Sequence, residues 1–492
     1  MTELSNDRTT EANGTKLLLL TSGATFMAFL DTTVVNVAFP ALHSSYPAVS
    51  LAILSWVVSG FAIAFAALLT PAGRLADVLG RRQVFLASVA VFTLASLACA
   101  AAPDFGVLLG ARVLQGIGAA GMIPAALGLL LAEMPPARLL SAIGIWGASG
   151  SMAAAAGPSL GGLLIAATDW RAVFVLNVPI GALILLSGWR SVPARPGQSG
   201  RLPDGVGTAA ATAGIAGVVI GLTKGSDWGW GAPSTIGALV IGLALVMVAV
   251  ARSRRHPVPA IPISLWDSRT FAVANLTSLL AGAALYAWLL AGPLYLTTFW
   301  GYSVLRAGLA VTPGALTSAV AAILVGKRVA LGRQPAVVAG ALVVFAAVGV
   351  WIWAGLGRQP VFLEVWLPAG LIGGAAFGAA LTGLSTAAAI SVPPVHFAGG
   401  MALNTAARQI GGALGVAAMA AIASAESGTY ALRDVFLFAG LSSFAAGVVG
   451  LGLLPRPARL TRGRPRGEAA AAVPQPRMVP EGSLAAEEAE SA

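Results

Sequence analysis

The sequence is poor in the residues that build catalytic and metal sites. Its 492 residues include one cysteine, Cys99, and three histidines that lie far apart in the chain. An internal disulfide is therefore excluded, and a cysteine–histidine metal cluster is not predicted. No glycine-rich loop ending in Lys-Ser or Lys-Thr is present, which excludes the P-loop that would couple the protein directly to ATP. We expect no metal, no cofactor and no enzymatic activity.

Charged residues are also scarce. Only 10% of the residues are charged and 57% are hydrophobic, and the mean hydropathy is +0.85, whereas a soluble domain carries about 25% charged residues. Apolar runs long enough to cross about 30 Å of hydrocarbon predict about fourteen helices. Their approximate cores are residues 17–39, 51–72, 84–102, 106–132, 139–166, 170–189, 206–223, 234–251, 271–297, 307–326, 335–355, 362–390, 400–423 and 435–454. The predicted fold class is an all-α polytopic membrane protein.

The net charge of +10 follows from the distribution of Lys and Arg along the chain. Most of these 29 residues fall in segments that are cytoplasmic if the amino terminus starts in the cytoplasm, as the positive-inside rule requires. We expect a multi-pass protein of the cell (cytoplasmic) membrane with both termini in the cytoplasm. Because orientation accounts for the charge, no nucleic-acid partner is predicted.

A Pro/Gly/Arg-rich stretch from Arg190 to Gly205 and a basic stretch from Arg252 to Arg269 divide the spans into groups of six, two and six. The expected parts are a cytoplasmic tail at 1–16, a six-helix bundle at 17–190, a linker with two additional spans at 191–269, a second six-helix bundle at 270–454, and a disordered cytoplasmic tail at 455–492. The last part is Pro/Arg-rich and then Ala/Glu-rich, which is typical of disorder.

Asp31 lies inside the first predicted span, and no other acid lies as deep in any span. A carboxylate in a bilayer-length helix is costly, so it marks a proton or ion path or a substrate partner. Arg112 lies in the fourth span, and both residues are roughly 9 to 12 Å from the outer ends of their spans. Pairing in one state and separation in another would change the proton affinity of the carboxylate. The alternative is an arginine satisfied by backbone carbonyls within the bundle.

The loop between the second and third spans reads Gly73-Arg-Leu-Ala-Asp77-Val-Leu-Gly80-Arg81-Arg82. Its glycines allow a tight turn, and Asp77 is expected to accept hydrogen bonds from a helix N-terminus, that of the span that begins near Gly399. The loop resembles motif A of the major facilitator superfamily, although Val78 stands where the family has a basic residue. The alternative is a loop that is basic for orientation alone.

Further segments extend this resemblance from about residue 17 to residue 454. Arg112-Val-Leu-Gln115-Gly116 resembles motif B, and Gly157-Pro158-Ser-Leu-Gly161-Gly162 resembles motif C, which is associated with antiporters in this superfamily. The segments from Trp170 to Pro179 and from Asn404 to Gly412 also match the fourteen-span drug:proton antiporter branch. A proline beside a glycine removes a backbone donor and a side chain, so the fifth span is expected to flex there.

The resemblance implies two pseudo-symmetric halves around a midplane site and export of lipophilic drugs or antibiotics in exchange for protons. Such a protein would confer resistance or secrete a secondary metabolite, and it would work as a monomer with a small lipophilic substrate, protons and membrane lipids as partners. A proton-coupled importer or metabolite carrier of the same superfamily is the alternative. A membrane enzyme or receptor would need a polar catalytic cluster or a large extramembrane domain, and neither is visible.

Polar and aromatic side chains within spans are candidates for the substrate cavity: Asn36, Gln115, Asn275, Tyr286 and Trp288. Two further charged residues are secondary candidates for coupling, Glu364 at the outer mouth of the twelfth span and Arg408 toward the inner side of the thirteenth. Glu364 is more simply an interfacial residue. Several tryptophans are expected at the membrane–water interface, namely Trp170, Trp228, Trp230 and Trp266.

Overall fold

The computed structural model describes residues 2–49, 51–195, 204–393, 396–425 and 429–454. The predicted disordered tail therefore lies outside the described residues, and so do the side chains of Asn36 and Pro158. The described residues form α-helices with short 3-10 and π turns, and no strand occurs among them. This agrees with the all-helical class that the composition predicts.

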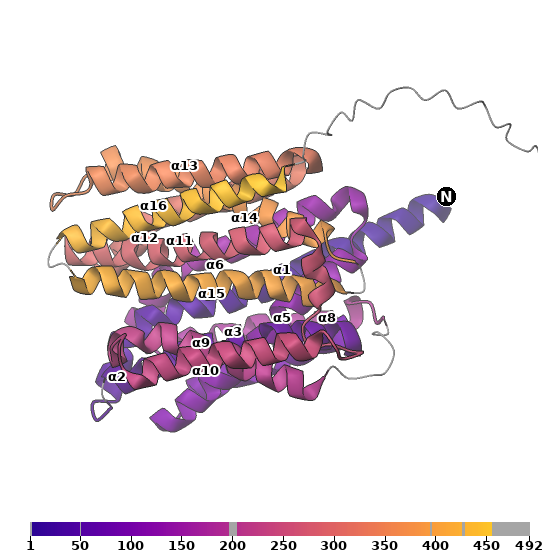
Figure 1. Cartoon of the computed structure of the whole chain (residues 1–492), viewed down its shortest axis with the longest axis horizontal. Helices are drawn as coiled ribbons and strands as arrows, with labels where there is room; N and C mark the ends of the chain where they lie inside the picture. The colour runs from indigo at the N-terminus through magenta and orange to yellow at the C-terminus, as the bar shows by residue number, and fades with distance from the viewer. Residues whose placement is uncertain (1, 50, 196–203, 394–395, 426–428, 455–492) are drawn as a thin grey trace, which may run out of the picture. The chain divides into compact units, whose positions relative to one another are not determined.

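The helices run side by side, parallel or antiparallel to one another (Figure 1). The α-helices are α1 (Thr2–Ser45), α2 (Leu51–Leu54), α3 (Trp56–Leu79), α4 (Arg81–Ala100), α5 (Phe105–Glu133), α6 (Pro136–Ala167), α7 (Ala172–Val175), α8 (Asn177–Ser191), α9 (Gly205–Trp228), α10 (Pro233–Ser253), α11 (Arg269–Thr298), α12 (Val304–Arg328), α13 (Gln334–Gly355), α14 (Leu367–Ile390), α15 (Phe397–Ala425) and α16 (Thr429–Gly450). A π-helical turn, Phe362–Trp366, leads into α14.

Within the described residues, twelve helical segments are long and apolar enough to cross a membrane. The chain is therefore a multi-pass membrane protein. Two more helices, α6 and α15, have 32 and 29 residues, but some of their side chains lie outside the described residues. The fourteen-span count thus stays a prediction at these two helices. The first helix also departs from the prediction, because it begins at Thr2 and continues to Ser45.

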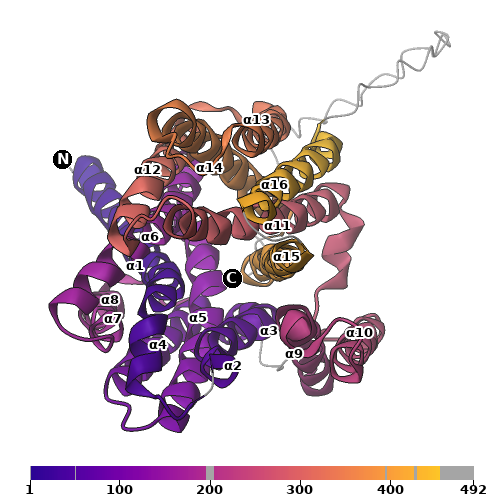
Figure 2. The same cartoon turned by 90° about the vertical axis from the view of Figure 1, so that its left-hand side faces the viewer.

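Neighbouring helices pack within each half of the chain and along two seams between the halves. α1 packs on α6, and α5 packs on α3 and α4, while α11 packs on α15 and α16. The seams join α3 to α15 and α6 to α12 (Figure 2). The two central helices, α9 and α10, pair with each other, and α9 also contacts α3 and α15. α10 lies at the outside of the helix arrangement in Figure 2.

Three of the four tryptophans expected at the interface are exposed, and one is not. Trp228, Trp230 and Trp266 are 40%, 43% and 43% exposed. Trp170 is fully buried, so its assignment to the interface is wrong. The reason is that Trp170 lies in the turn between α6 and α7, close to the end of α1, where its indole Nε1 donates to Ser45 Oγ at 3.0 Å. The ring also packs against Tyr46 and Phe174.

This difference predicts unequal costs for two tryptophan substitutions. Trp170→Ala should lower the free energy of unfolding by about 3–5 kcal/mol, because it opens a cavity in a packed site. Trp228→Ala, at a 40% exposed position, is the matched control and should cost far less. Thermal unfolding of the purified variants in detergent measures both. Equal shifts in the melting temperature would show that Trp170 does not anchor the end of α1.

Candidate functional site

The Asp31 carboxylate is enclosed by three polar side chains from two other helices, α5 and α8. Arg112 Nη1 lies 2.6 Å from Asp31 Oδ2. Gln115 Nε2 donates to Asp31 Oδ1 at 2.8 Å, and Asn177 Nδ2 donates to the same oxygen at 3.1 Å. Each of these four side chains belongs to a residue that is at most 1% exposed. The carboxylate is therefore sealed from solvent in this conformation, with a cation and two amides as partners.

Arg112 is held in place by more than its ion pair. Its Nε donates to the Val57 carbonyl at 2.9 Å, and its Nη1 also donates to Gln115 Oε1 at 2.6 Å. The guanidinium carbon lies 4.5 Å from the ring centre of Phe61 and 5.6 Å from that of Phe174. Flanking rings favour a cation through their quadrupoles. Directed acceptors and flanking rings together fix the plane of the guanidinium against Asp31.

Helical spacing explains how the network is assembled. Arg112 and Gln115 are three residues apart and share one face of α5. On α4, Ser96 and Cys99 have the same spacing, and both contact Gln115, with Gln115 Nε2 donating to Ser96 Oγ at 2.8 Å and Cys99 Sγ lying 3.7 Å from Gln115 Oε1. Because the surroundings are apolar, the polar atoms of this network rely on one another for hydrogen bonds.

The structure thus joins Asp31 and Arg112, as their matching depths indicated, although their role in coupling stays a prediction. Gln115, expected to line the cavity, is fully buried in this network. Sequence reasoning missed Ser96 and Asn177 as partners. Asn177 carried a signal, since a lone amide in the apolar run from Phe174 to Pro179 needs a partner. Its Oδ1 atom has no hydrogen-bond partner in the described part of the chain.

The cavity candidates of the second half are placed differently from one another. The Tyr286 hydroxyl donates to Gln409 Oε1, which links α11 to α15. Asn275 is buried and donates to the carbonyl of Phe271 in its own helix. The Trp288 ring lies 5.0 Å from that of Phe345 and 5.1 Å from that of Phe436, so it packs among α11, α13 and α16. Tyr286 alone among these three joins a polar contact between helices.

The two secondary candidates for coupling have opposite surroundings. Glu364 is exposed in the π-helical turn before α14, which favours the interfacial interpretation over a proton carrier. Arg408 is 6% exposed and lies on α15 against α11, where its backbone oxygen faces Gly282. Neither residue reaches Asp31.

A second polar cluster lies at the end of the structure where α3 ends and α15 begins, which we term the latch end. Asp77 Oδ2 accepts from the backbone N–H of Gly399 at 2.8 Å, and Oδ1 accepts from that of Ala398 at 3.2 Å. Arg81 Nη2 lies 2.9 Å from Oδ1. The Asp77 carboxylate therefore caps the N-terminus of α15, as the sequence predicts. Its function as a gate stays a prediction.

Two glycines of the same loop meet geometric demands. Gly80 has a φ of 108° at the turn between α3 and α4, a conformation that side chains disfavour. At Gly73 a Cβ atom would collide with the Ala402 side chain and the Ala398 carbonyl, so glycine allows α3 and α15 to touch. The last residue of the motif, Arg82, contacts Trp189 on α8 through the ring and the backbone carbonyl.

One histidine extends the latch. Arg74 Nη1 lies 3.1 Å from His396 Nδ1, just before α15. Burial lowers the pKa of His396, and the positive charge of Arg74 lowers it further, against a smaller opposite effect of Asp77. The imidazole is therefore neutral at pH 7 and accepts the hydrogen bond from Arg74. This contact and the Asp77 cap both join α3 to the start of α15.

The motif C residues lie along one helix that stays continuous through Gly157 and Pro158. A Cβ at Gly157 would collide with Thr33, one at Gly161 would make ordinary contact with α1, and one at Gly162 would meet open space. The first two glycines thus face α1. The expected flexing of this helix is not visible as a break and stays a prediction.

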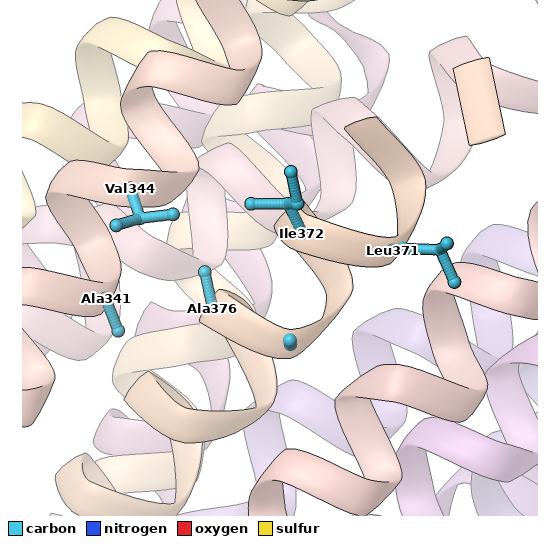
Figure 3. Close-up of a pocket in the computed structure, with 6 residues that line it drawn as sticks. Ala341, Val344, Leu371, Ile372 and Ala376 are labelled. Atoms are coloured by element: carbon cyan, nitrogen blue, oxygen red, sulfur yellow. The ribbon is translucent and has the colours of Figure 1, made fainter. Parts of the chain in front are cut away.

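A shallow hollow of about 390 Å³ lies between α13 and α14. Ala341, Val344, Leu371, Ile372 and Ala376 surround it in Figure 3, with Ala375 completing the lining. All six residues are apolar, so nothing in the hollow orients a polar ligand. No group of His, Cys, Asp and Glu that could hold a metal ion occurs among the described residues.

Many membrane-length helices, two seams between halves, and a buried ion pair in one half define an integral membrane transporter. Residues 21–207 match the family model described as Major Facilitator Superfamily. The chain is 32% identical to the methylenomycin A resistance protein of Streptomyces coelicolor over 91% of this chain and 94% of that one. It is also 32% identical to the multidrug resistance protein Stp of Mycobacterium tuberculosis, over 84% of this chain and 77% of that one.

A solved structure gives the same fold. The crystal structure of the human organic anion transporter MFSD10 superimposes with a TM-score of 0.64 at 18% identity, covering 87% of this chain and 99% of that one. At this identity the likeness concerns the fold alone. The chain belongs to the major facilitator superfamily.

The buried pair predicts a non-additive pattern of stabilities. Asp31→Asn leaves Arg112 as an uncompensated buried charge and should lower the free energy of unfolding by about 3–5 kcal/mol. The double variant Asp31→Asn/Arg112→Gln removes both charges and should lose less than the sum of the single variants. Asp169→Asn breaks an ion pair whose side chains are 46% and 41% exposed and should cost about 0–1 kcal/mol. Additive melting shifts in detergent would argue against the coupling.

The latch predicts a shift in conformation. Asp77→Asn keeps the shape of the side chain but loses the charge that faces Arg81 and the N-terminus of α15, worth about 1 kcal/mol or a roughly fivefold change in population. Pulsed electron paramagnetic resonance between spin labels at the ends of α3 and α15 should show longer distances. Glu133→Gln is the control, because Glu133 pairs with Arg195 instead of α15. An unchanged distance distribution in Asp77→Asn would contradict the prediction that Asp77 holds α3 and α15 together.

Proposed function

We propose that the protein is a proton-coupled exporter of lipophilic drugs or antibiotics, which confers resistance or secretes a secondary metabolite. The two relatives are named resistance proteins and align with most of this chain. The observation that carries the coupling is the Asp31 carboxylate, which is sealed in the first half with Arg112 at 2.6 Å. A titratable group buried in a span marks a proton path, and its partner controls when it binds a proton.

We further propose the arrangement in the membrane. Fourteen spans form two six-helix bundles at 17–190 and 270–454, with α9 and α10 as the additional pair in the segment 191–269. The distribution of Lys and Arg supports cytoplasmic termini, which makes the latch end the cytoplasmic end. The contacts of Asp77 with Ala398 and Gly399 then correspond to a state closed toward the cytoplasm.

In the proposed cycle Asp31 changes its partner as the halves rock. While Arg112 donates to the carboxylate, the guanidinium balances its negative charge. If the movement of α1 against α5 separates them, the carboxylate takes up a proton to avoid lying as an isolated charge in an apolar medium. Proton uptake from one side and release to the other drives export against the substrate gradient. Gly157 and Gly161 give α1 a smooth surface on α6 along which to move.

Replacing the carboxylate tests this function. Asp31→Asn has a similar shape but binds no proton, so substrate-driven proton movement in inside-out vesicles should fall at least tenfold. Glu364→Gln, which alters an exposed carboxylate, is the control and should transport normally. A panel of lipophilic cations and natural-product antibiotics identifies substrates through the susceptibility of a pump-deficient host.

The same assay separates export from the alternatives. Substrate addition to vesicles that drives protons in the opposite sense would indicate an importer or metabolite carrier. Normal coupling in Asp31→Asn would place the proton carrier at another residue. Surface expression and thermal unfolding of both variants should be measured in parallel, so that lost coupling is not mistaken for lost protein.

A further inference from the structure

Four cationic side chains are buried in the described part of the chain, and three of them have polar partners. Arg112 pairs with Asp31, Lys224 pairs with Asp227, and Arg74 contacts His396. The fourth, Arg408, is 6% exposed. Within the described residues no side chain or carbonyl forms an ion pair or hydrogen bond with its guanidinium. Arg408 is therefore the buried cation that has no polar partner among the described residues.

The position of Arg408 makes the missing partner more notable. It lies eleven residues after the start of α15 at Phe397, and hence roughly 16 Å along the helix. Arg408 thus lies about two fifths of the way along α15, away from both ends of the helix, where an unpaired charge is unfavourable. A structural arginine at such a depth would be expected to hold carbonyls or a carboxylate of its own protein.

The neighbours of Arg408 offer a ligand an aromatic surface but no negative charge. Tyr286 is its electrostatic neighbour on α11, and the hydroxyl of that tyrosine is already directed to Gln409 Oε1. The Tyr286 ring packs over Gly412, one helical turn beyond Arg408. An aromatic ring beside an unoccupied guanidinium fits a flat apolar molecule that carries an acidic group.

The charges of the remaining spans also favour an anionic ligand. The one acid deep in a described span is Asp31, and Arg112 neutralises it. Glu364 is exposed, and Asp434 accepts from the Trp353 indole near the start of α16. No described carboxylate is thus free in the interior to hold a cationic substrate, whereas one cation is free to hold an anionic one.

We propose that Arg408 binds the carboxylate of the transported compound, so that the substrates include lipophilic acids. A guanidinium presents N–H donors in the planar fork that matches a carboxylate. This inference rests on the proposed function and adds the chemical class of substrate. It assigns Arg408 a role in binding, distinct from proton transfer at Asp31.

Binding can be measured without transport. The probes are 2-naphthoate, its neutral analogue 2-naphthamide, and the cation tetraphenylphosphonium, titrated by calorimetry into purified protein in nanodiscs. The wild-type protein should bind naphthoate at least roughly tenfold more tightly than naphthamide, because a hydrogen bond to a charged group is stronger than a neutral one. Equal affinities, or a preference for tetraphenylphosphonium, would overturn the proposal.

Variants assign the preference to Arg408. Arg408→Gln should abolish the tenfold preference, and Arg408→Lys should retain part of it, since it keeps the charge without the fork. Arg333→Gln, at an exposed position, controls for the general loss of a positive charge and should bind as the wild-type protein does. A preference that survives in Arg408→Gln would contradict the assignment. Gel filtration and thermal unfolding check the fold of each variant.

Transport assays separate failure of this inference from failure of the proposed function. If neutral or cationic drugs drive proton movement through Asp31 while naphthoate binds no better than naphthamide, export stands and the acid specificity falls. If no compound of the panel drives proton movement although naphthoate binds through Arg408, the anion site stands and proton-coupled export falls.

Discussion

The cost of an unpaired charge in hydrocarbon governs how this chain arranges its few charged residues. Asp31 and Arg112 meet in the middle of one half, and Lys224 and Asp227 meet at the end of α9. Asp204, just before α9, pairs with Arg252 on α10. Here the Arg252 hydrogen bond lowers the pKa of Asp204, so this carboxylate stays ionised across the physiological range. Lys224 and Asp227 lie on one helix, but the Asp31–Arg112 and Asp204–Arg252 pairs each join two segments. Hydrophobic contact alone would leave those segments free to slide, because lipid tails are as apolar as the helices.

At the latch end, the groups that need a partner are the backbone N–H groups of a helix terminus. The first N–H groups of a helix have no partners within it, and in α15 two of them reach Asp77 on another helix. Satisfying them with a side chain from the other half makes the cap depend on the relative position of the halves. Such a cap forms or breaks as a unit, which suits a two-state rearrangement better than a gradual one.

Depth was predictable from the sequence, and rotation about the helix axis was not. Counting residues from the span ends placed Asp31 opposite Arg112 and Asp77 near Gly399, because rise per residue is fixed. The same counting cannot say which face a side chain occupies. Trp288 therefore packs among α11, α13 and α16 although the sequence made it a cavity candidate. Trp170 escaped prediction because the turn that holds it packs against the end of α1, a contact between segments far apart in the sequence.

Asn177 donates to Asp31 while its own oxygen has no partner among the described residues. The amide is a two-faced group, so a half-turn about its terminal bond exchanges the donor for an acceptor. A protonated Asp31 carries an O–H that must donate, and the turned amide would receive it. Asn177 can thus pair with both protonation states of the carboxylate through one rotation, in which the unpartnered position passes from the amide oxygen to the amide nitrogen and the number of unpartnered amide atoms does not rise.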